Sequence, residues 1–313
     1  MPNNNPHRIG LALSGGTLKA AAHIGVLEAL QDLNIQPDFI AGTSAGSFIS
    51  ALYAHGYTIT QLKELVNRFP GPRLLDYGFP VLSSVSNLLR YRLQSIFHKH
   101  DVAPLVNGLL RGKQLEAYFR SKFRNRSAQM PFAVVATDLY TGKPIVFSND
   151  LALLEREQAV KMTDLTRSLC GSCALPGVLT PVHLGPWLLA DGALRHYVPV
   201  EVLRQAGCDK IIVVNLTKLE PNWQPTTFIE VVTRSFDILL NETISDDLEG
   251  TDVFLLEPDV SHVTWVSFDE LHACVQAGQQ VVELNKFTLL RFLRETPTDS
   301  GPIIKLRPLK ERP

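Results

Sequence analysis

Short apolar runs that end in small residues and lead into helical patterns constrain the fold of this chain more than any other feature. The run Ile9–Leu13 leads into Ser14-Gly15-Gly16, and apolar residues then recur at helical spacing from Ala20 to Leu33. The pattern repeats with a run at Phe39–Ala41 and a helix-like segment from Ala45 to His55. Strands buried on both faces read as continuous apolar runs, and helices connect them when they are parallel. The sequence therefore predicts an α/β fold with a mostly parallel central sheet.

The rest of the chain extends this pattern. We expect further strands at 132–136, 145–147, 188–190, 211–215 and 253–256. We expect further helices at 60–69, 112–123, 160–170, 200–206, 228–243 and 268–294. The simplest organisation is one domain over residues 8–295, with the aromatic and basic segment 70–112 as a candidate cap and 296–313 as a C-terminal tail.

The composition is that of an ordinary globular protein, with 45% hydrophobic and 19% charged residues in a chain of 313. The 30 Lys and Arg residues nearly balance the 31 Asp and Glu residues, so the charge does not support nucleic-acid binding. Residues 1–8 are polar and do not have the form of a signal peptide. No segment approaches the roughly 18 apolar residues of a membrane span. We expect a cytoplasmic protein, and a peripheral contact with membranes stays open.

The cysteines and carboxylates do not form a metal-binding pattern. Cys170 and Cys173 form a C-x-x-C, but no second pair or histidine pair follows at zinc-site spacing, and the segment around them is apolar. We interpret them as small buried side chains, with a redox or zinc pair as the alternative. The chain also lacks H-E-x-x-H and the EF-hand pattern, so we expect no metal and no cofactor.

Gly42-Thr43-Ser44-Ala45-Gly46 is a G-x-S-x-G motif between a predicted strand and a predicted helix. That context is the one a nucleophile elbow requires, because the sharp turn needs small residues two positions before and after the serine. The start of the following helix offers N–H groups to a developing oxyanion. A plain glycine-rich turn is the alternative interpretation, and the strand–turn–helix context favours the elbow.

Two other motifs complete the candidate site. In Ser14-Gly15-Gly16-Thr17-Leu18-Lys19, consecutive glycines allow backbone N–H groups to converge on an anion, and Lys19 adds positive charge. An oxyanion hole fits better than a phosphate loop, because both G-x-x-x-x-G-K-[ST] and G-x-G-x-x-G are absent. Asp191-Gly192-Ala193 follows a predicted strand end, where a carboxylate is able to point into a site, although a D-G pair alone indicates only a turn.

Taken together and in this order, the three motifs resemble the patatin-like phospholipase family. The intervening runs Ala21–Leu27, Val135–Leu139 and Ser172–Val178 also fit that family, and the later segments resemble its bacterial branch related to neuropathy target esterase. The resemblance covers roughly residues 8 to 290. It implies a three-layer αβα fold with a mostly parallel sheet and the nucleophile on a strand–turn–helix elbow.

The resemblance implies a serine acyl-ester hydrolase of the phospholipase A or lysophospholipase type. Ser44 would be the nucleophile and Asp191 the general base, without a histidine. Gly15, Gly16, Thr17 and Lys19 would form or support the oxyanion hole, and Gly42, Gly46 and Gly192 would be the motif glycines. We expect His23, in the helix after the glycine-rich block, to have a packing or capping role.

This sequence departs from the family pattern at two positions, since it has Thr17 and Ala20 where the family usually has glycine. A β-branched threonine resists a positive φ, so we expect the loop to shift and the activity or substrate range to fall. Two alternatives to a lipid hydrolase therefore stay open. One is an esterase or thioesterase for small soluble substrates, and the other is a catalytically silent regulatory or adaptor protein with the same fold.

Overall fold

The computed structural model describes residues 7–76, 108–156, 159–219, 223–224, 228–248, 252–264 and 267–295. Most of the candidate cap, residues 77–107, and the predicted tail, residues 296–313, lie outside these described residues.

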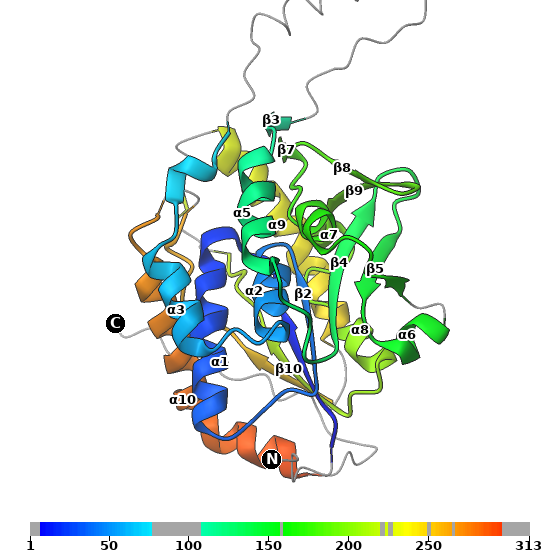
Figure 1. The fold of residues 1–313 in the computed structure, drawn as a ribbon. Helices are drawn as coiled ribbons and strands as arrows, with labels where there is room; N and C mark the ends of the chain where they lie inside the picture. The colour runs from blue at the N-terminus through cyan, green and yellow to red at the C-terminus, as the bar shows by residue number, and fades with distance from the viewer. Residues whose placement is uncertain are drawn as a thin grey trace, which may run out of the picture.

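In the described part of the chain, one nine-stranded sheet forms the centre of the fold (Figure 1). Its main path runs in the order β11 (Val253–Leu256), β10 (Lys210–Val214), β1 (Ile9–Leu13), β2 (Phe39–Thr43), β4 (Phe132–Asp138), β5 (Pro144–Ser148) and β6 (Val160–Lys161). The strands from β11 to β4 are parallel to their neighbours, and β5 is antiparallel to β4. β9 (Trp187–Asp191) pairs with the same edge of β4 as β2 does, and β8 (Val182–Leu184) pairs with β9. The expected mostly parallel sheet is confirmed.

Helices cover both faces of this sheet. One face carries α1 (Ala21–Asp32), α2 (Ala45–Ala54), α3 (Ile59–Asn67), α5 (Lys113–Phe123), α7 (Leu165–Ser172) and α10 (Leu271–Arg294), and the other carries α6 (Leu151–Glu155), α8 (Val200–Gln205) and α9 (Phe228–Asp247). Figure 1 shows α1, α3 and α10 together on the left and α6 and α8 on the right. Short 3₁₀ helices occupy Thr17–Ala20 (η1), Gly71–Leu74 (η2) and Gly192–Leu194 (η3).

The alternation of side chains along β1 shows how the layers are held. Leu11 and Leu13 pack into the core that includes α1, α2 and α10, whereas Ala12 packs into the core that includes α8 and α9. Successive side chains of a strand point to opposite faces, so a continuous apolar run supplies both cores at once. The three-layer αβα architecture is therefore confirmed. No helix in the described part of the chain is long and apolar enough to cross a membrane.

Every predicted strand and helix has a counterpart in the structure, but one predicted helix is partly wrong and several short elements were not predicted. The predicted helix at 160–170 is wrong in its first half, because Val160–Lys161 forms β6 and α7 begins only at Leu165. The reason is local, since the Asp164 side chain accepts a hydrogen bond from the Arg167 N–H and caps the helix there. Three short strands, β3 (Gly108–Leu110), β7 (Gly177–Leu179) and β8, and the helix α6 were not predicted.

Candidate active site

Ser44 lies between the last residue of β2 and the first residue of α2, on a strained backbone. Its φ is 53° and its ψ is −130°, a combination that costs a non-glycine residue about 1–3 kcal/mol. The turn also requires close approach of neighbouring segments: a Cβ on Gly46 would lie 2.3 Å from the Ser14 carbonyl oxygen, and a Cβ on Gly42 would lie 2.5 Å from the Gly46 carbonyl oxygen. These contacts are the physical reason for the glycines of the motif, and the geometry is that of a nucleophile elbow.

The sheet brings Asp191 to Ser44 although the two residues are 147 positions apart. β2 pairs with the first half of β4, at 132–135, and β9 pairs antiparallel with the end of β4, at 136–138. Because β5 holds the opposite edge of β4, β2 and β9 share one edge and meet end to end. Gly192 permits this approach, since a Cβ there would lie 2.2 Å from the Val135 carbonyl oxygen.

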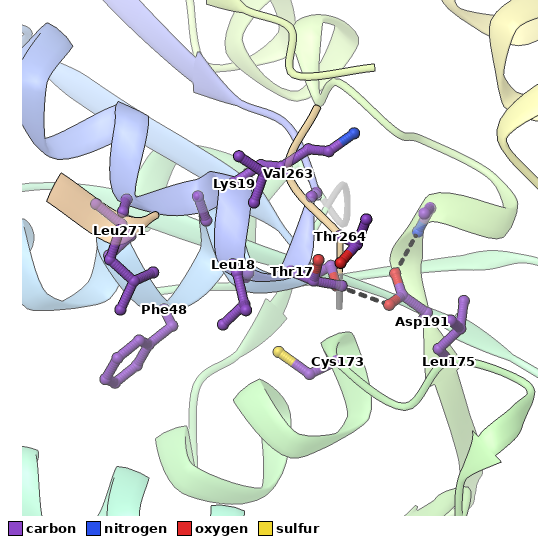
Figure 2. Close-up of a pocket in the computed structure, with 18 of the residues that line it drawn as sticks. Thr17, Leu18, Lys19, Phe48, Cys173, Leu175, Asp191, Val263, Thr264 and Leu271 are labelled. Carbon is purple, nitrogen blue, oxygen red and sulfur yellow. Dashed lines mark hydrogen bonds between the residues drawn. The ribbon is translucent and has the colours of Figure 1, made fainter. Parts of the chain in front are cut away.

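Ser44 and Asp191 are joined directly by a hydrogen bond (Figure 2). Ser44 Oγ donates to Asp191 Oδ2 over 2.8 Å, and the Ala193 N–H donates to Asp191 Oδ1 over 2.9 Å. Asp191 is only 2% exposed, and this burial raises the pKa of its carboxyl from 3.8 to about 7 against the opposing effect of those two hydrogen bonds. A carboxylate with this pKa is a far stronger base near neutral pH than an exposed aspartate.

Two serines hold the backbone of the elbow. The Ser44 N–H donates to Ser172 Oγ over 2.9 Å, and Ser172 Oγ in turn donates to the Val135 carbonyl over 2.6 Å. Ser47 Oγ donates to the Ser44 carbonyl over 2.6 Å. Sequence reasoning did not select Ser172 as a site residue, although it begins one of the runs that carry the family resemblance.

The glycine-rich loop lies against Ser44. A Cβ on Gly15 would be 3.2 Å from Ser44 Cβ, so the predicted neighbourhood of the two motifs is present. Gly16 has φ 149° and Thr17 has φ 53°. Thr17 thus adopts a positive φ despite its branched side chain, at a cost of about 1–2 kcal/mol. The Lys19 N–H donates to the Gly16 carbonyl over 3.0 Å. Figure 2 shows the Lys19 side chain above Thr17 and Asp191, without a contact to Asp191.

Histidine takes no direct part in this arrangement, since no histidine in the described part of the chain lines the pocket. His23 is fully buried, and its Nε2 donates to the Ser14 carbonyl over 2.9 Å. Burial lowers the pKa of His23 to about 4, so its ring is neutral near pH 7. His55 bonds the Ala51 carbonyl through Nδ1 over 2.7 Å. Both rings are hydrogen-bonded to backbone carbonyls, and for His23 this bond specifies the packing role that we expected.

Ser44 and Asp191 open into a cavity of about 350 Å³, a size typical of small-molecule sites. Most of its lining is apolar and comes from η1, α2, α3, α5, α10 and the segment after α7, including Leu62 and Phe119. Figure 2 shows four more of these apolar residues, Leu18, Phe48, Leu175 and Leu271. Another part of the lining is charged, with Lys19, Lys218, Glu230, Arg234 and Asp237. The cavity therefore combines a mostly apolar lining next to Ser44 with several charged side chains.

Cys173 also lines the cavity, beside Ser44 and Asp191. Cys170 and Cys173 are free and partly buried, and burial raises the pKa of both thiols, which makes them poor nucleophiles. Among the described residues no group of three or more His, Cys, Asp or Glu side chains is placed to hold a metal ion.

Comparison with known proteins agrees with this geometry. The family model for patatin-like phospholipases matches residues 11–204, which include the glycine-rich loop, the elbow and Asp191. The chain belongs to the patatin-like phospholipase family. The resemblance drawn from the three motifs is thus confirmed, and membership of this family supports the predicted class of enzyme, a hydrolase of lipid esters.

Relatives of this phospholipase-like chain differ in length. The uncharacterised protein YqhO of Bacillus subtilis is 25% identical over 295 residues, which are 90% of this chain and 97% of that protein. An uncharacterised NTE family protein of Mycobacterium tuberculosis is 23% identical over 87% of this chain and 45% of its own length. Lysophospholipase NTE1 of Kluyveromyces lactis is 24% identical over 68% of this chain but only 13% of its own length. The chain therefore spans less than half of these NTE relatives.

Proposed function

We propose that this protein is a serine acyl-ester hydrolase of the phospholipase A or lysophospholipase type, in which Ser44 and Asp191 form a catalytic dyad. The observation that supports it most directly is the 2.8 Å hydrogen bond from Ser44 Oγ to a buried carboxylate, at the wall of a mostly apolar cavity. No histidine is needed, because burial gives Asp191 a pKa of about 7.

The reaction follows from these groups. Asp191 takes the hydroxyl proton as Ser44 Oγ attacks the ester carbonyl carbon, and the resulting oxyanion is stabilised by N–H groups of the loop at Gly15 and Gly16. When the tetrahedral intermediate collapses, the ester bond breaks and Asp191 returns its proton to the leaving alcohol. A water molecule then attacks the acyl-enzyme with Asp191 again as base, which releases the fatty acid and restores Ser44.

The shape of the cavity indicates the substrate. The apolar lining from α2, α3 and α5 suits an acyl chain, and burial of each methylene favours binding by about 0.8 kcal/mol. The charged side chains on the other part of the wall suit a polar head group or the water that surrounds it. We infer that the substrate is a lipid ester rather than a short soluble ester. The enzyme would reach it from solution or through a peripheral contact with a lipid surface.

The experiment is hydrolysis of p-nitrophenyl esters of increasing chain length by the wild type, Ser44→Ala and Asp191→Asn. Both variants are expected to lose at least about 10³-fold in kcat, and the wild type is expected to prefer long chains. An alkyl fluorophosphonate should label the wild type and not Ser44→Ala. Wild-type kcat/KM should fall about tenfold per pH unit below about pH 7, because protonated Asp191 cannot accept the serine proton. Folded wild type without turnover or labelling would favour the silent adaptor, and a preference for short chains would favour the small esterase.

A further inference from the structure

Two buried side chains hold consecutive carbonyl groups of the glycine-rich loop. His23, on α1, donates from Nε2 to the Ser14 carbonyl over 2.9 Å. Tyr197, in the segment that follows η3, donates from its hydroxyl to the Gly15 carbonyl over 2.9 Å. His23 is 0% exposed and Tyr197 is 3% exposed, so neither hydrogen bond competes with bulk water. The loop is thus held from two different elements of the fold.

Peptide geometry turns these contacts into a direction for the loop N–H groups. In a trans peptide the C=O and the N–H of the next residue point to opposite sides. With the Ser14 carbonyl held by His23, the Gly15 N–H points away from His23. With the Gly15 carbonyl held by Tyr197, the Gly16 N–H points away from Tyr197.

Gly15 lies beside both Tyr197 and Ser44. A Cβ on Gly15 would lie 3.1 Å from Tyr197 Cε2 and 3.2 Å from Ser44 Cβ, so both side chains contact the segment whose N–H groups are in question. Within the described part of the chain, the N–H groups of Gly15 and Gly16 donate no hydrogen bond. Two N–H groups that are oriented and not used by the protein are what an oxyanion requires.

We propose that His23 and Tyr197 are positioning residues, which hold the Ser14 and Gly15 carbonyls so that the N–H groups of Gly15 and Gly16 face the oxyanion formed at Ser44. This inference rests on the proposed function, because it assigns the parts that orient its oxyanion hole. Tyr197 lines the cavity and His23 does not, and in this proposal each acts through the backbone of the loop.

Further hydrogen bonds fix the Tyr197 hydroxyl, and another donor also binds the Gly15 carbonyl. Thr217 Oγ1 donates to the Tyr197 oxygen, and the Thr217 N–H donates to Asn215 Oδ1 over 3.0 Å. Ser14 Oγ also donates to the Gly15 carbonyl over 2.9 Å and accepts from the Leu216 N–H over 3.1 Å. Since Ser14 Oγ remains when the tyrosine hydroxyl is removed, we expect a partial loss rather than a complete one.

Both donors keep their protons in the working pH range. Burial raises the pKa of Tyr197 above its ordinary value, so its hydroxyl stays protonated. Burial lowers the pKa of His23 to about 4, and the neutral ring must carry its proton on Nε2, because the partner of that nitrogen is a carbonyl oxygen. The hold on the loop therefore does not change with pH near neutrality.

The test is Tyr197→Phe, with Tyr57→Phe as the matched control. Tyr57 donates its hydroxyl to the Lys122 carbonyl over 2.7 Å and does not line the cavity, so its substitution also removes one tyrosine–carbonyl hydrogen bond. We expect Tyr197→Phe to lower kcat about tenfold with KM unchanged, less than the loss of a whole oxyanion donor. Tyr57→Phe should leave both constants unchanged.

A transition-state analogue separates orientation of the loop from general stability. A long-chain trifluoromethyl ketone forms a tetrahedral adduct with the serine, and its Ki should rise by the same factor by which kcat/KM falls. The Ki of an ether analogue of the same chain length, which forms no adduct, should not move. His23→Gln, which keeps an N–H donor, should retain more activity than His23→Leu.

Each result bears on a different conclusion. Unchanged kcat in Tyr197→Phe, or a lower kcat with an unchanged ketone Ki, would overturn the positioning role while the Ser44-dependent hydrolysis of the wild type stands. Wild type without Ser44-dependent hydrolysis would overturn the proposed function and the positioning role with it. If His23→Leu does not fold, Tyr197→Phe still decides, because it removes a single oxygen atom.

Discussion

The buried charge of Asp191 makes a prediction about stability that does not depend on any substrate. Its carboxyl has a pKa of about 7 in the folded protein and 3.8 as the ordinary value. Between these two values the folded state holds a proton that the unfolded state has lost. Stability therefore decreases as the pH rises through this window, because the folded protein must bury the carboxylate. The Asp191→Asn variant carries no such charge and escapes this loss.

The magnitude follows from the size of the shift. Each pH unit between the two pKa values changes the free energy of unfolding by about 1.4 kcal/mol. Between about pH 5 and pH 8 the wild type should thus lose about 2–3 kcal/mol relative to Asp191→Asn. The asparagine amide also changes the hydrogen bonds at this position, but that effect on the free energy of unfolding does not depend on pH. It therefore cancels when only the change of the difference with pH is compared.

The assay is urea unfolding of both proteins at several pH values in that range, with Asp138→Asn as a control. Asp138 is also buried, but hydrogen bonds from Thr141 and from the N–H groups of Tyr140 and Leu188 outweigh its burial and lower its pKa. It therefore titrates below the range, and its difference from wild type should stay constant. A constant difference for Asp191→Asn as well would refute the raised pKa, and a wild type that gains stability relative to Asp191→Asn as the pH rises would mean a lowered one.

Three further predictions concern the elbow, the loop and the cavity. Gly46→Ala should destabilise the protein by about 3 kcal/mol in urea unfolding, because its Cβ would lie 2.3 Å from a backbone oxygen. Gly142→Ala, at φ +68° with nothing within 4 Å, should lose only about 1 kcal/mol, and equal losses would contradict this account. Thr17→Gly should gain up to about 1 kcal/mol in the same assay by relief of the positive φ, whereas a clear loss would mean that the threonine side chain stabilises the loop. Phe48→Ala should lower kcat/KM for long esters relative to short ones about tenfold, because it removes apolar lining that buries the acyl chain, and an unchanged chain-length profile would exclude Phe48 from the acyl site.

The elements of the fold were predictable where one local rule decided them. Buried parallel strands are continuous apolar runs, and β1 and β11 were predicted with the bounds that the structure has. The three-residue strands β3, β7 and β8 were not, because a segment of that length holds too little periodicity to be recognised. The start of α7 was missed since the Asp164 cap outweighs the helical spacing of the residues before it.

Thr17 shows a case in which tertiary structure overrides a local preference. The branched side chain disfavours a positive φ, and we expected the loop to shift. In this structure the backbone of Thr17 nevertheless has φ 53°, and the preceding Gly15 and Ser14 are tied to Tyr197, His23 and Leu216. The shift of the loop stays a prediction. Packing and hydrogen bonds around the loop stabilise this backbone by more than the positive φ of Thr17 costs.

The sequence by itself determined the class of fold, the elbow and the identity of the residues in the three motifs, because steric needs of a tight turn and the burial of strands act over a few neighbouring positions. Only the tertiary structure decided that β9 ends where β2 ends, which places Asp191 against Ser44, and that burial there raises the pKa of the carboxyl to about 7. It alone also brought His23 and Tyr197, 174 positions apart (197 − 23), onto consecutive carbonyls of one loop. Such contacts depend on how strands and helices from distant parts of the chain pack together, and a local sequence pattern does not predict that packing.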